Sequence, residues 1–275
     1  MTYTTLAEDT SIHIEQMYLA SLRDAGIAKR IAIASTHTRR MQQLSLNGFK
    51  RRDGDIKIVR QKFAKALLGI EPDFELGNEE LGSGPDMWAD SDPFDLACEL
   101  HSIFDRIGVD YFVTGGVAAC CHGEPRATVD LDLVIQIELE DMDILGATLS
   151  ESGFYVPDIN LENVASGTEK SLNIIHQQKC TKADLIIMSM GPFDISRMSR
   201  REFVEPGFFV CSAEDTILKK LNWSKRSQSE KQWSDVQTIL RIQGDSLDFG
   251  YMTRWATTLT VAEELQDALT DAGLG

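Results

Sequence analysis

The chain is organised around the segment TGGVAACCHGEPRATVDLDLV, residues 114–134. The apolar residues 111–113 just before it predict a short buried strand, and the small residues after the glycine pair predict a helix over 117–122. A second strand is predicted over 129–137. His122, at the end of the helix, is interpreted as structural. The segment therefore predicts a strand, a glycine turn, a helix and a strand in succession.

Two aspartates and two glycines in this segment indicate its chemistry. Side chains at positions i and i+2 of a strand share a face, so Asp130 and Asp132 are predicted to stand side by side. Neighbouring carboxylates repel each other unless a cation lies between them, and Mg²⁺ suits carboxylates combined with substrate phosphates. Gly115 and Gly116 let the backbone of a strand-to-helix turn approach a phosphate at the helix start. The pattern predicts a nucleotide site; the alternatives are a solvated strand edge and a simple tight turn.

Three further residues extend this candidate site. Asp184 interrupts an apolar strand predicted over 182–188, where it would complete a site for two metal ions and accept the proton of an attacking hydroxyl. The alternative is a strand-end acid in water. Arg126 either binds a phosphate or pairs with an acid such as Glu124. Thr128 is placed in the nucleotide site as well, although a β-branched residue suits a strand in any case.

Gly115-Gly116, followed after thirteen residues by Asp130-Leu131-Asp132, resembles the motif of the nucleotidyltransferase superfamily of DNA polymerase β type. The whole run of residues 115–132 resembles bacterial nucleotidyltransferase-like proteins related to the AbiEii toxin family, which include tRNA-modifying toxins of toxin–antitoxin systems. The resemblance covers roughly residues 95–260. It implies a small mixed sheet flanked by helices. It also implies transfer of a nucleoside monophosphate from an NTP to a hydroxyl, with two Mg²⁺ ions and release of pyrophosphate. The toxins usually carry serine where this chain has Gly116.

The resemblance extends to the C-terminal helices, through residues 214–221 and 234–236. It implies that Lys220 and Asp235 face the nucleotide, where Lys220 would stabilise the charge of the triphosphate. The alternative for both is a solvated helix face. Three tryptophans on these helices are interpreted as lobe core, with stacking on a base as the alternative. They are Trp223, Trp233 and Trp255.

Composition divides the chain into four segments and predicts the α+β class. Residues 1–70 show helical spacing with a break at Asp53-Gly54, which predicts a basic, helical N-terminal extension. Residues 71–92 hold eight acids and no Lys or Arg, which indicates an acidic linker. Residues 93–211 form the predicted core. Residues 212–275 form a helical C-terminal lobe, where capping-box patterns predict helix starts near 213, 230 and 261.

Charge is distributed unevenly along the chain. The net charge of −16 and a pI of about 4.7 disfavour tight binding to nucleic acid. Residues 23–65 nevertheless hold twelve Lys and Arg against three acids, so the rest of the chain carries −25. This basic segment either guides a nucleic-acid acceptor or docks on the acidic linker or on a protein partner such as an antitoxin.

The chain lacks the marks of export or membrane insertion. No apolar stretch approaches the ~20 residues of a membrane span, and the N-terminus has no signal-peptide pattern. Five scattered cysteines indicate a reduced, cytoplasmic protein.

These patterns predict a Mg²⁺-dependent nucleotidyltransferase. Its metal ligands and catalytic residues would be Asp130, Asp132 and Asp184. Its NTP-binding residues would be Gly115, Gly116, Arg126, Thr128 and Lys220. The acceptor is left open among RNA, a protein and a small molecule. The alternatives are a non-catalytic nucleotide-binding or interaction protein on the same fold, and a nucleic-acid-binding regulator that acts through the basic segment.

Overall fold

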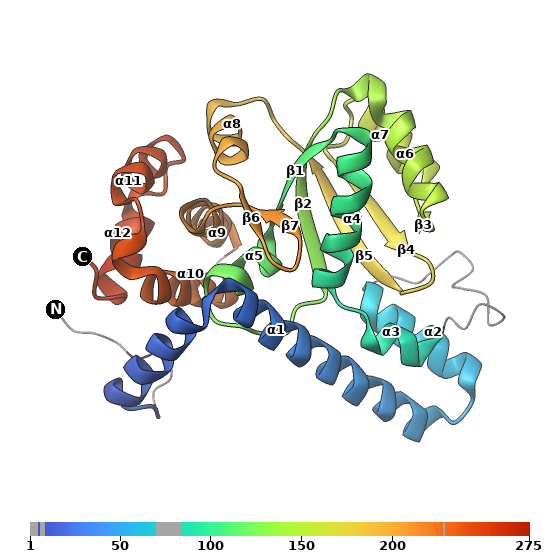
Figure 1. The fold of residues 1–275 in the computed structure, drawn as a ribbon, viewed down its shortest axis with the longest axis horizontal. Coiled ribbons are helices and arrows are strands. Elements are labelled where there is room, and N and C mark those ends of the chain that lie inside the picture. The colour runs from blue at the N-terminus through green and yellow to red at the C-terminus, as the bar shows by residue number, and fades with distance from the viewer. Residues whose placement is uncertain (1–4, 6–8, 70–83, 228) are drawn as a thin grey trace.

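The computed structural model describes residue 5 and residues 9–69, 84–227 and 229–275. One mixed sheet lies at its centre, in the order β3-β4-β5-β2-β1-β7-β6 (Figure 1). β2 runs parallel to β5 and β1 runs parallel to β7, whereas the other neighbours are antiparallel. The strands are β1 (Asp110–Thr114), β2 (Asp130–Gln136), β3 (Phe154–Tyr155), β4 (Ser171–His176), β5 (Thr181–Ile187), β6 (Glu202–Val204) and β7 (Phe208–Val210). The predicted α+β class, with a mixed sheet flanked by helices, is confirmed.

Helix α4 (Pro93–Ile107) lies across one face of this sheet (Figure 1). It begins where predicted, because the Asp92 carboxylate accepts hydrogen bonds from the first backbone N–H groups and proline occupies the first turn. Leu100 and Phe104 on its apolar face join the main core with Leu131 and Leu133 of β2. Each such buried side chain contributes roughly 1.5–3 kcal/mol. Because side chains alternate along β2, its aspartates point to the opposite face.

Shorter helices complete the sheet layer. α5 (Gly115–His122) follows β1 directly, and α6 (Met142–Glu151) packs against α7 (Asp158–Ala165) beside α4. α8 (Pro192–Ser199) precedes the β6–β7 hairpin. β3, α7, α8 and β6 were not predicted from the sequence, and each is at most eight residues long.

The C-terminal helices pack around an apolar core of their own. They are α9 (Ala213–Ser227), α10 (Glu230–Gln243), α11 (Phe249–Thr258) and α12 (Ala262–Asp271). The cap predicted at Ser212 forms, because Ser212 Oγ accepts from the backbone N–H of Asp215 and donates to its carboxylate. The helix starts predicted near 213, 230 and 261 agree with the starts of α9, α10 and α12, but the side-chain caps predicted at Ser229 and Thr260 do not form. Ser229 makes no side-chain cap hydrogen bond, and Val261 occupies the cap position of α12, one residue after Thr260.

The N-terminal helices are built into the fold. α1 (Ile12–Asp53) bends at Gly26, runs from the C-terminal helices along the sheet layer and ends at the predicted break (Figure 1). Ile31 and Ala34 of α1 belong to the main core. The guanidinium of Arg30 is buried and donates to the backbone carbonyl of Cys121 in α5 (2.9 Å). α1 is therefore a structural part of the layer that carries the glycine turn.

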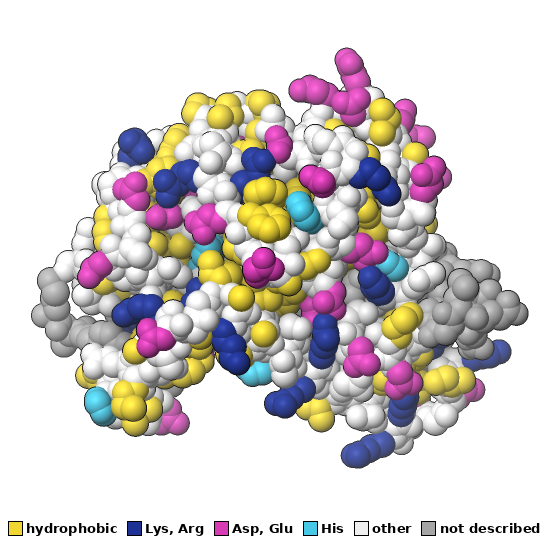
Figure 2. Space-filling model, in the orientation of Figure 1, with side chains coloured by type: hydrophobic (Ala, Val, Ile, Leu, Met, Phe, Trp, Pro, Cys, Tyr) yellow, Lys and Arg dark blue, Asp and Glu magenta, His cyan; other side chains and the backbone are white. Residues whose placement is uncertain are grey.

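Residues 70–83, most of the predicted acidic linker, lie outside the described residues. The following residues form α3 (Pro85–Asp90), whose Trp88 is buried against α2 (Ile56–Leu68) and the β4–β5 turn. Lys50 pairs with Asp86 at 2.6 Å, and Arg39 reaches Asp92 at 2.8 Å. Figure 2 shows basic and acidic side chains interspersed over this lower part of the molecule. These contacts agree with a basic segment that docks on its own acidic neighbour.

None of the helices that the structure describes is both long and apolar enough to cross a bilayer. All five cysteines are free thiols, four of them buried.

Candidate active site

The strand register brings the three predicted aspartates to one face of the sheet. Asp132 of β2 stands opposite Asp184 of β5, and Asp130 stands opposite Lys182. Thr114, the last residue of β1, flanks Asp132 on its other side. Asp130 is exposed, whereas Asp132 and Asp184 are half-buried.

The aspartates crowd each other electrostatically. Burial raises the pKa of Asp132, and the charges of Asp184 and Asp130 raise it further. Burial also raises the pKa of Asp184, although Lys182 partly offsets this. Lys182 Nζ lies 2.9 Å from Asp130 Oδ1, so a resident cation already neutralises part of the cluster.

The residues present fit Mg²⁺ in the kind of donor they offer. Hard carboxylate oxygens are the ligands that Mg²⁺ prefers, and a divalent cation relieves the repulsion that burdens Asp132. Across residues 9–69, 84–227 and 229–275, no three His, Cys, Asp or Glu side chains stand grouped so that they could hold a metal, so the aspartate side chains would have to shift to bind one.

The glycine turn fits closely against these carboxylates. Gly115 has φ +65°, and a Cβ at this position would lie 1.9 Å from Asp132 Oδ2. A Cβ at Gly116 would lie 2.7 Å from Thr128 Oγ1, so serine does not fit there unless Thr128 moves. The backbone of the turn can therefore lie directly against Asp132 and Thr128 only because both residues are glycine.

A cavity of about 440 Å³ opens between the sheet and the C-terminal helices. Every predicted site residue except Asp184 lines it, namely Gly115, Gly116, Arg126, Thr128, Asp130, Asp132 and Lys220. The sequence analysis did not assign several others to the site. These are Thr114, Ile186, Thr216, Lys219, Lys231 and Gln232.

Two cations at the wall of this cavity are held by one buried carboxylate. Arg126 binds Asp235 through two hydrogen bonds of 2.9 and 2.8 Å, and Lys220 Nζ donates to the same carboxylate at 2.7 Å. Burial favours the neutral form of Asp235, but the hydrogen bonds from Arg126 and the charge of Lys220 outweigh it and lower its pKa. The suggested pairing of Arg126 with Glu124 is wrong, because Glu124 instead accepts from the hydroxyl of Tyr18 (2.8 Å). The alternative of a solvated face for Lys220 and Asp235 is also wrong, since both are buried.

The N-terminal helix supports the start of the aspartate strand. The backbone N–H of Thr128 donates to Thr38 Oγ1 of α1 at 3.1 Å, and Thr38 is fully buried. α1 thus fixes the backbone two residues before Asp130, a contact between positions 90 residues apart. No local pattern in the sequence indicates this contact.

His122 and two of the three C-terminal tryptophans are buried or packed as predicted, whereas the third tryptophan is exposed. His122 is buried, and its Nε2 donates to the backbone carbonyl of Cys211 (2.7 Å), which agrees with a structural role. Trp233 and Trp255 pack against the core of the C-terminal helices, as expected. The interpretation of Trp223 as core is wrong, because it is 65% exposed and lines the cavity. The spacing of Thr216, Lys220 and Trp223 on one helix face was the signal that could have placed it there.

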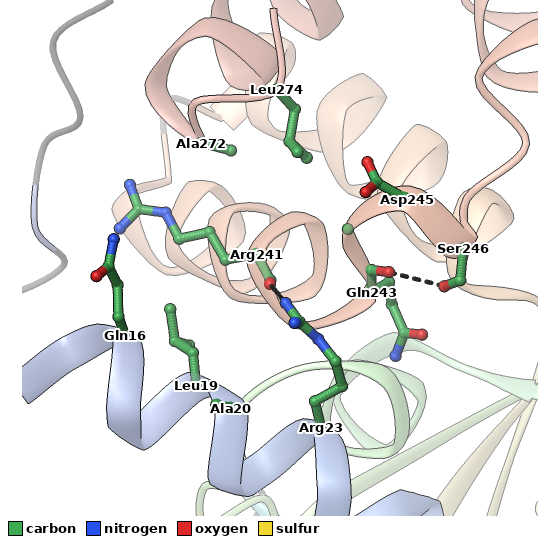
Figure 3. A pocket seen from close by; sticks show the side chains of 11 residues that line it. Gln16, Leu19, Ala20, Arg23, Arg241, Gln243, Asp245, Ser246, Ala272 and Leu274 are labelled. Atoms are coloured by element: carbon green, nitrogen blue, oxygen red, sulfur yellow. Dashed lines mark hydrogen bonds between the residues drawn. The ribbon is translucent and has the colours of Figure 1, made fainter. Parts of the chain in front are cut away.

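A second cavity, of about 520 Å³, lies between α1, α10 and the C-terminus (Figure 3). Its arginines already bind protein groups. Arg23 donates to the backbone carbonyls of Ile242 and Arg241, both at 2.8 Å, and Arg241 pairs with the buried Glu15 at 2.7 Å. These contacts join α1 to the C-terminal helices, so the cavity at the aspartates is the stronger candidate for chemistry.

No protein-family model matches the chain, and no curated protein matches it. Solved structures that resemble it include an antigenic nucleotidyltransferase-like protein from Paracoccidioides brasiliensis, with 19% identity, 64% of this chain and 91% of that chain covered, and a TM-score of 0.42. The antibiotic-resistance factor ANT(2'')-Ia has 12% identity, coverage of 64% and 99%, and a TM-score of 0.42. The cyclic AMP-GMP synthase DncV of Vibrio cholerae has 12% identity, coverage of 92% and 68%, and a TM-score of 0.25.

All three likenesses have identities below 20% and TM-scores below 0.5. Because the identities and TM-scores are low, the function proposed below rests on this chain's own residues. The closer resemblance to AbiEii-related proteins stays a prediction.

Proposed function

We propose that the protein is a Mg²⁺-dependent nucleotidyltransferase that transfers a nucleoside monophosphate from an NTP to a hydroxyl of an acceptor. The observation that carries the proposal is the lining of a single cavity. A glycine turn, two aspartates of one strand and a pair of cations fixed by a buried carboxylate face the same space.

The phosphates of the NTP would lie at the glycine turn. The backbone N–H groups at the start of α5 are directed at this position, and the helix dipole favours negative charge there. Lys220 and Arg126 add positive charge to the same cavity, and Arg126 Nη2 lies only 3.7 Å from the place that a Cβ at Gly116 would take. Since Asp235 holds both cations in place, they need little reorganisation when the triphosphate arrives.

In the reaction, the acceptor oxygen forms a bond to the α-phosphorus of the NTP. The bond from that phosphorus to the bridging oxygen breaks, and pyrophosphate leaves. Asp184 would accept the proton of the attacking hydroxyl. Asp130, Asp132 and Asp184 would hold Mg²⁺, which when bound neutralises phosphate charge and lowers the pKa of the hydroxyl. Asp130 would leave its ion pair with Lys182 to do so.

Incubation with each α-labelled NTP, Mg²⁺ and total RNA or protein tests this proposal. We expect label to enter one acceptor pool with the wild-type protein and pyrophosphate to be released. Asp132→Ala should reduce both by about 10²- to 10³-fold, the loss typical of removing one electrostatic group from an active site. Asp110→Asn is a matched control, because Asp110 lies at the far end of β1, where it pairs with Arg201 at 2.6 Å.

The result also decides the acceptor class. Label in RNA would support the finer, toxin-like form of the proposal, which is prompted by the resemblance of residues 115–132 to AbiEii-related proteins. Label in protein would favour modification of a side-chain hydroxyl. Absence of transfer and of pyrophosphate release with every NTP would contradict the proposal and favour a non-catalytic nucleotide-binding protein on the same fold.

The nucleic-acid-binding regulator is the weaker candidate. Several basic side chains of residues 23–65 are committed within the chain, as in the contacts of Arg39 with Asp92 and Asp95 and of Lys50 with Asp86. A protein partner such as an antitoxin for this segment remains a proposal, to be tested by co-purification from the native host.

A further inference from the structure

One face of α9 runs along the candidate active site. Thr216, Lys219, Lys220 and Trp223 all line the cavity, and their spacing of three, four and seven residues places them on the same side of the helix. Lys220 stands at the end where the phosphates would lie, and Trp223 stands further along the helix. Three residues of helix correspond to an axial rise of about 4.5 Å.

Trp223 differs from the other tryptophans of the C-terminal helices. Trp233 and Trp255 pack against the apolar core, and the ring of Trp255 lies 5.0 Å from that of Phe193. Trp223 is 65% exposed. Of the described residues that line the cavity, it is the one with an aromatic side chain. A single exposed apolar residue is ordinary on a protein surface. Its position in the lining of the cavity at the aspartates, one turn beyond the buried Lys220, is what indicates a ligand.

We propose that the indole of Trp223 is the platform on which the base of the NTP stacks. The inference rests on the nucleotidyltransferase function proposed above and adds the part of the site that recognises the base. A nucleotide carries its base at the far side of the sugar from its phosphates, so a ligand with its phosphates at Lys220 and the glycine turn extends its base along α9 toward Trp223. Stacking on an indole is available to every base, because each base has a π face.

The experiment compares a ligand with a base to one without. Binding of the four nonhydrolysable NTP analogues is measured by calorimetry with Mg²⁺, and the analogue that binds best is carried forward. Inorganic tripolyphosphate with Mg²⁺ is the matched ligand that lacks sugar and base. The variants are Trp223→Ala and Trp223→Phe.

We expect Trp223→Ala to weaken binding of the analogue by about 5- to 150-fold, which corresponds to the 1–3 kcal/mol of one stacked base. Binding of tripolyphosphate should change less than about twofold, since its contacts lie at the glycine turn and Lys220. Trp223→Phe should restore most of the affinity, because it keeps an aromatic face. Analogue binding should also quench the fluorescence of the wild-type protein but not that of Trp223→Phe, which retains the other three tryptophans.

Two outcomes would overturn the inference. Equal weakening of analogue and tripolyphosphate in Trp223→Ala would assign Trp223 to the shape of the phosphate site. Unchanged analogue binding combined with a raised KM for the acceptor would assign the indole to the acceptor instead. Failure of the proposed function is distinguishable from both, because it appears as absence of label transfer and pyrophosphate release by the wild-type protein, whereas analogue binding is measured without turnover.

Discussion

Asp235 is the single buried anion that holds Arg126 and Lys220 at the cavity wall, and its replacement has a calculable cost. The side chains of Asp235 and Lys220 are each 7% exposed, and Arg126 is 26% exposed. Asp235→Asn keeps the shape of the side chain but removes the carboxylate that pairs with both the buried Lys220 and the half-buried Arg126. Breaking a buried pair in this way costs 3–5 kcal/mol, and the partial exposure of Arg126 favours the lower end, about 3 kcal/mol.

Thermal unfolding at neutral pH without nucleotide measures this cost. For a chain of this size, about 3 kcal/mol corresponds to a fall in Tm of about 6–12 °C. Glu264→Gln is the matched control, because Glu264 pairs with the exposed Lys225 at 2.8 Å, and such a surface pair contributes only about 0–1 kcal/mol. A Tm shift for Asp235→Asn no larger than that of Glu264→Gln would refute the reasoning.

The pH dependence gives a second test of the same pair. The pKa of Asp235 is lower in the folded protein than in the unfolded chain, so its stabilisation is present above the unfolded pKa of about 3.8. The difference in unfolding free energy between wild type and Asp235→Asn should therefore be constant near neutral pH. It should shrink as the pH falls through the folded pKa, because the wild-type carboxylate then becomes protonated.

Two further variants test the structure around the glycine turn. Burial lowers the pKa of His122 to about 4, so only the unfolded chain gains a proton on this group between pH 6.5 and 4. The free energy of unfolding of the wild type should therefore fall by up to about 1.4 kcal/mol for each pH unit in this range. Urea unfolding should show a weaker dependence of this free energy on pH for His122→Gln. Equal slopes would contradict this burial. Gly115→Ala should be more destabilising than Gly54→Ala in the same assay, because both have similar positive φ values but only position 115 meets Asp132, whereas nothing lies within 4 Å of a Cβ at Gly54. We expect the backbone conformation to reduce the free energy of unfolding by about 1–3 kcal/mol at either site, with a further loss at position 115 alone. Equal losses at the two positions would show that the Asp132 side chain moves aside without loss of stability.

The features that were predicted correctly from the sequence depend on residues that are close together along the chain. The alternation in β2 separates Leu131 from Asp130 and Asp132, and this requires only the geometry of a strand. The cap at Asp92 and the break at residues 53–54 depend likewise on side chains within a few positions. The pattern at Ser229 likewise located the start of α10 at Glu230, whereas the pattern at Thr260 fell one residue before the cap position of α12.

Packing between distant segments decided the rest. The sequence left Arg126 either to bind a phosphate or to pair with an acid such as Glu124, and it binds Asp235, 109 positions away, because the C-terminal helices pack over the turn. The same packing buries Lys220 and places Trp223 in the cavity lining, and the packing of α1 brings Thr38 against Thr128. A sequence pattern reflects interactions between residues that are close along the chain. The partner of a buried charge is instead whichever opposite charge the tertiary fold brings within hydrogen-bonding distance. The sequence by itself therefore determined the glycine turn and the aspartate strand, and the tertiary structure alone decided which cations and which aromatic ring face them.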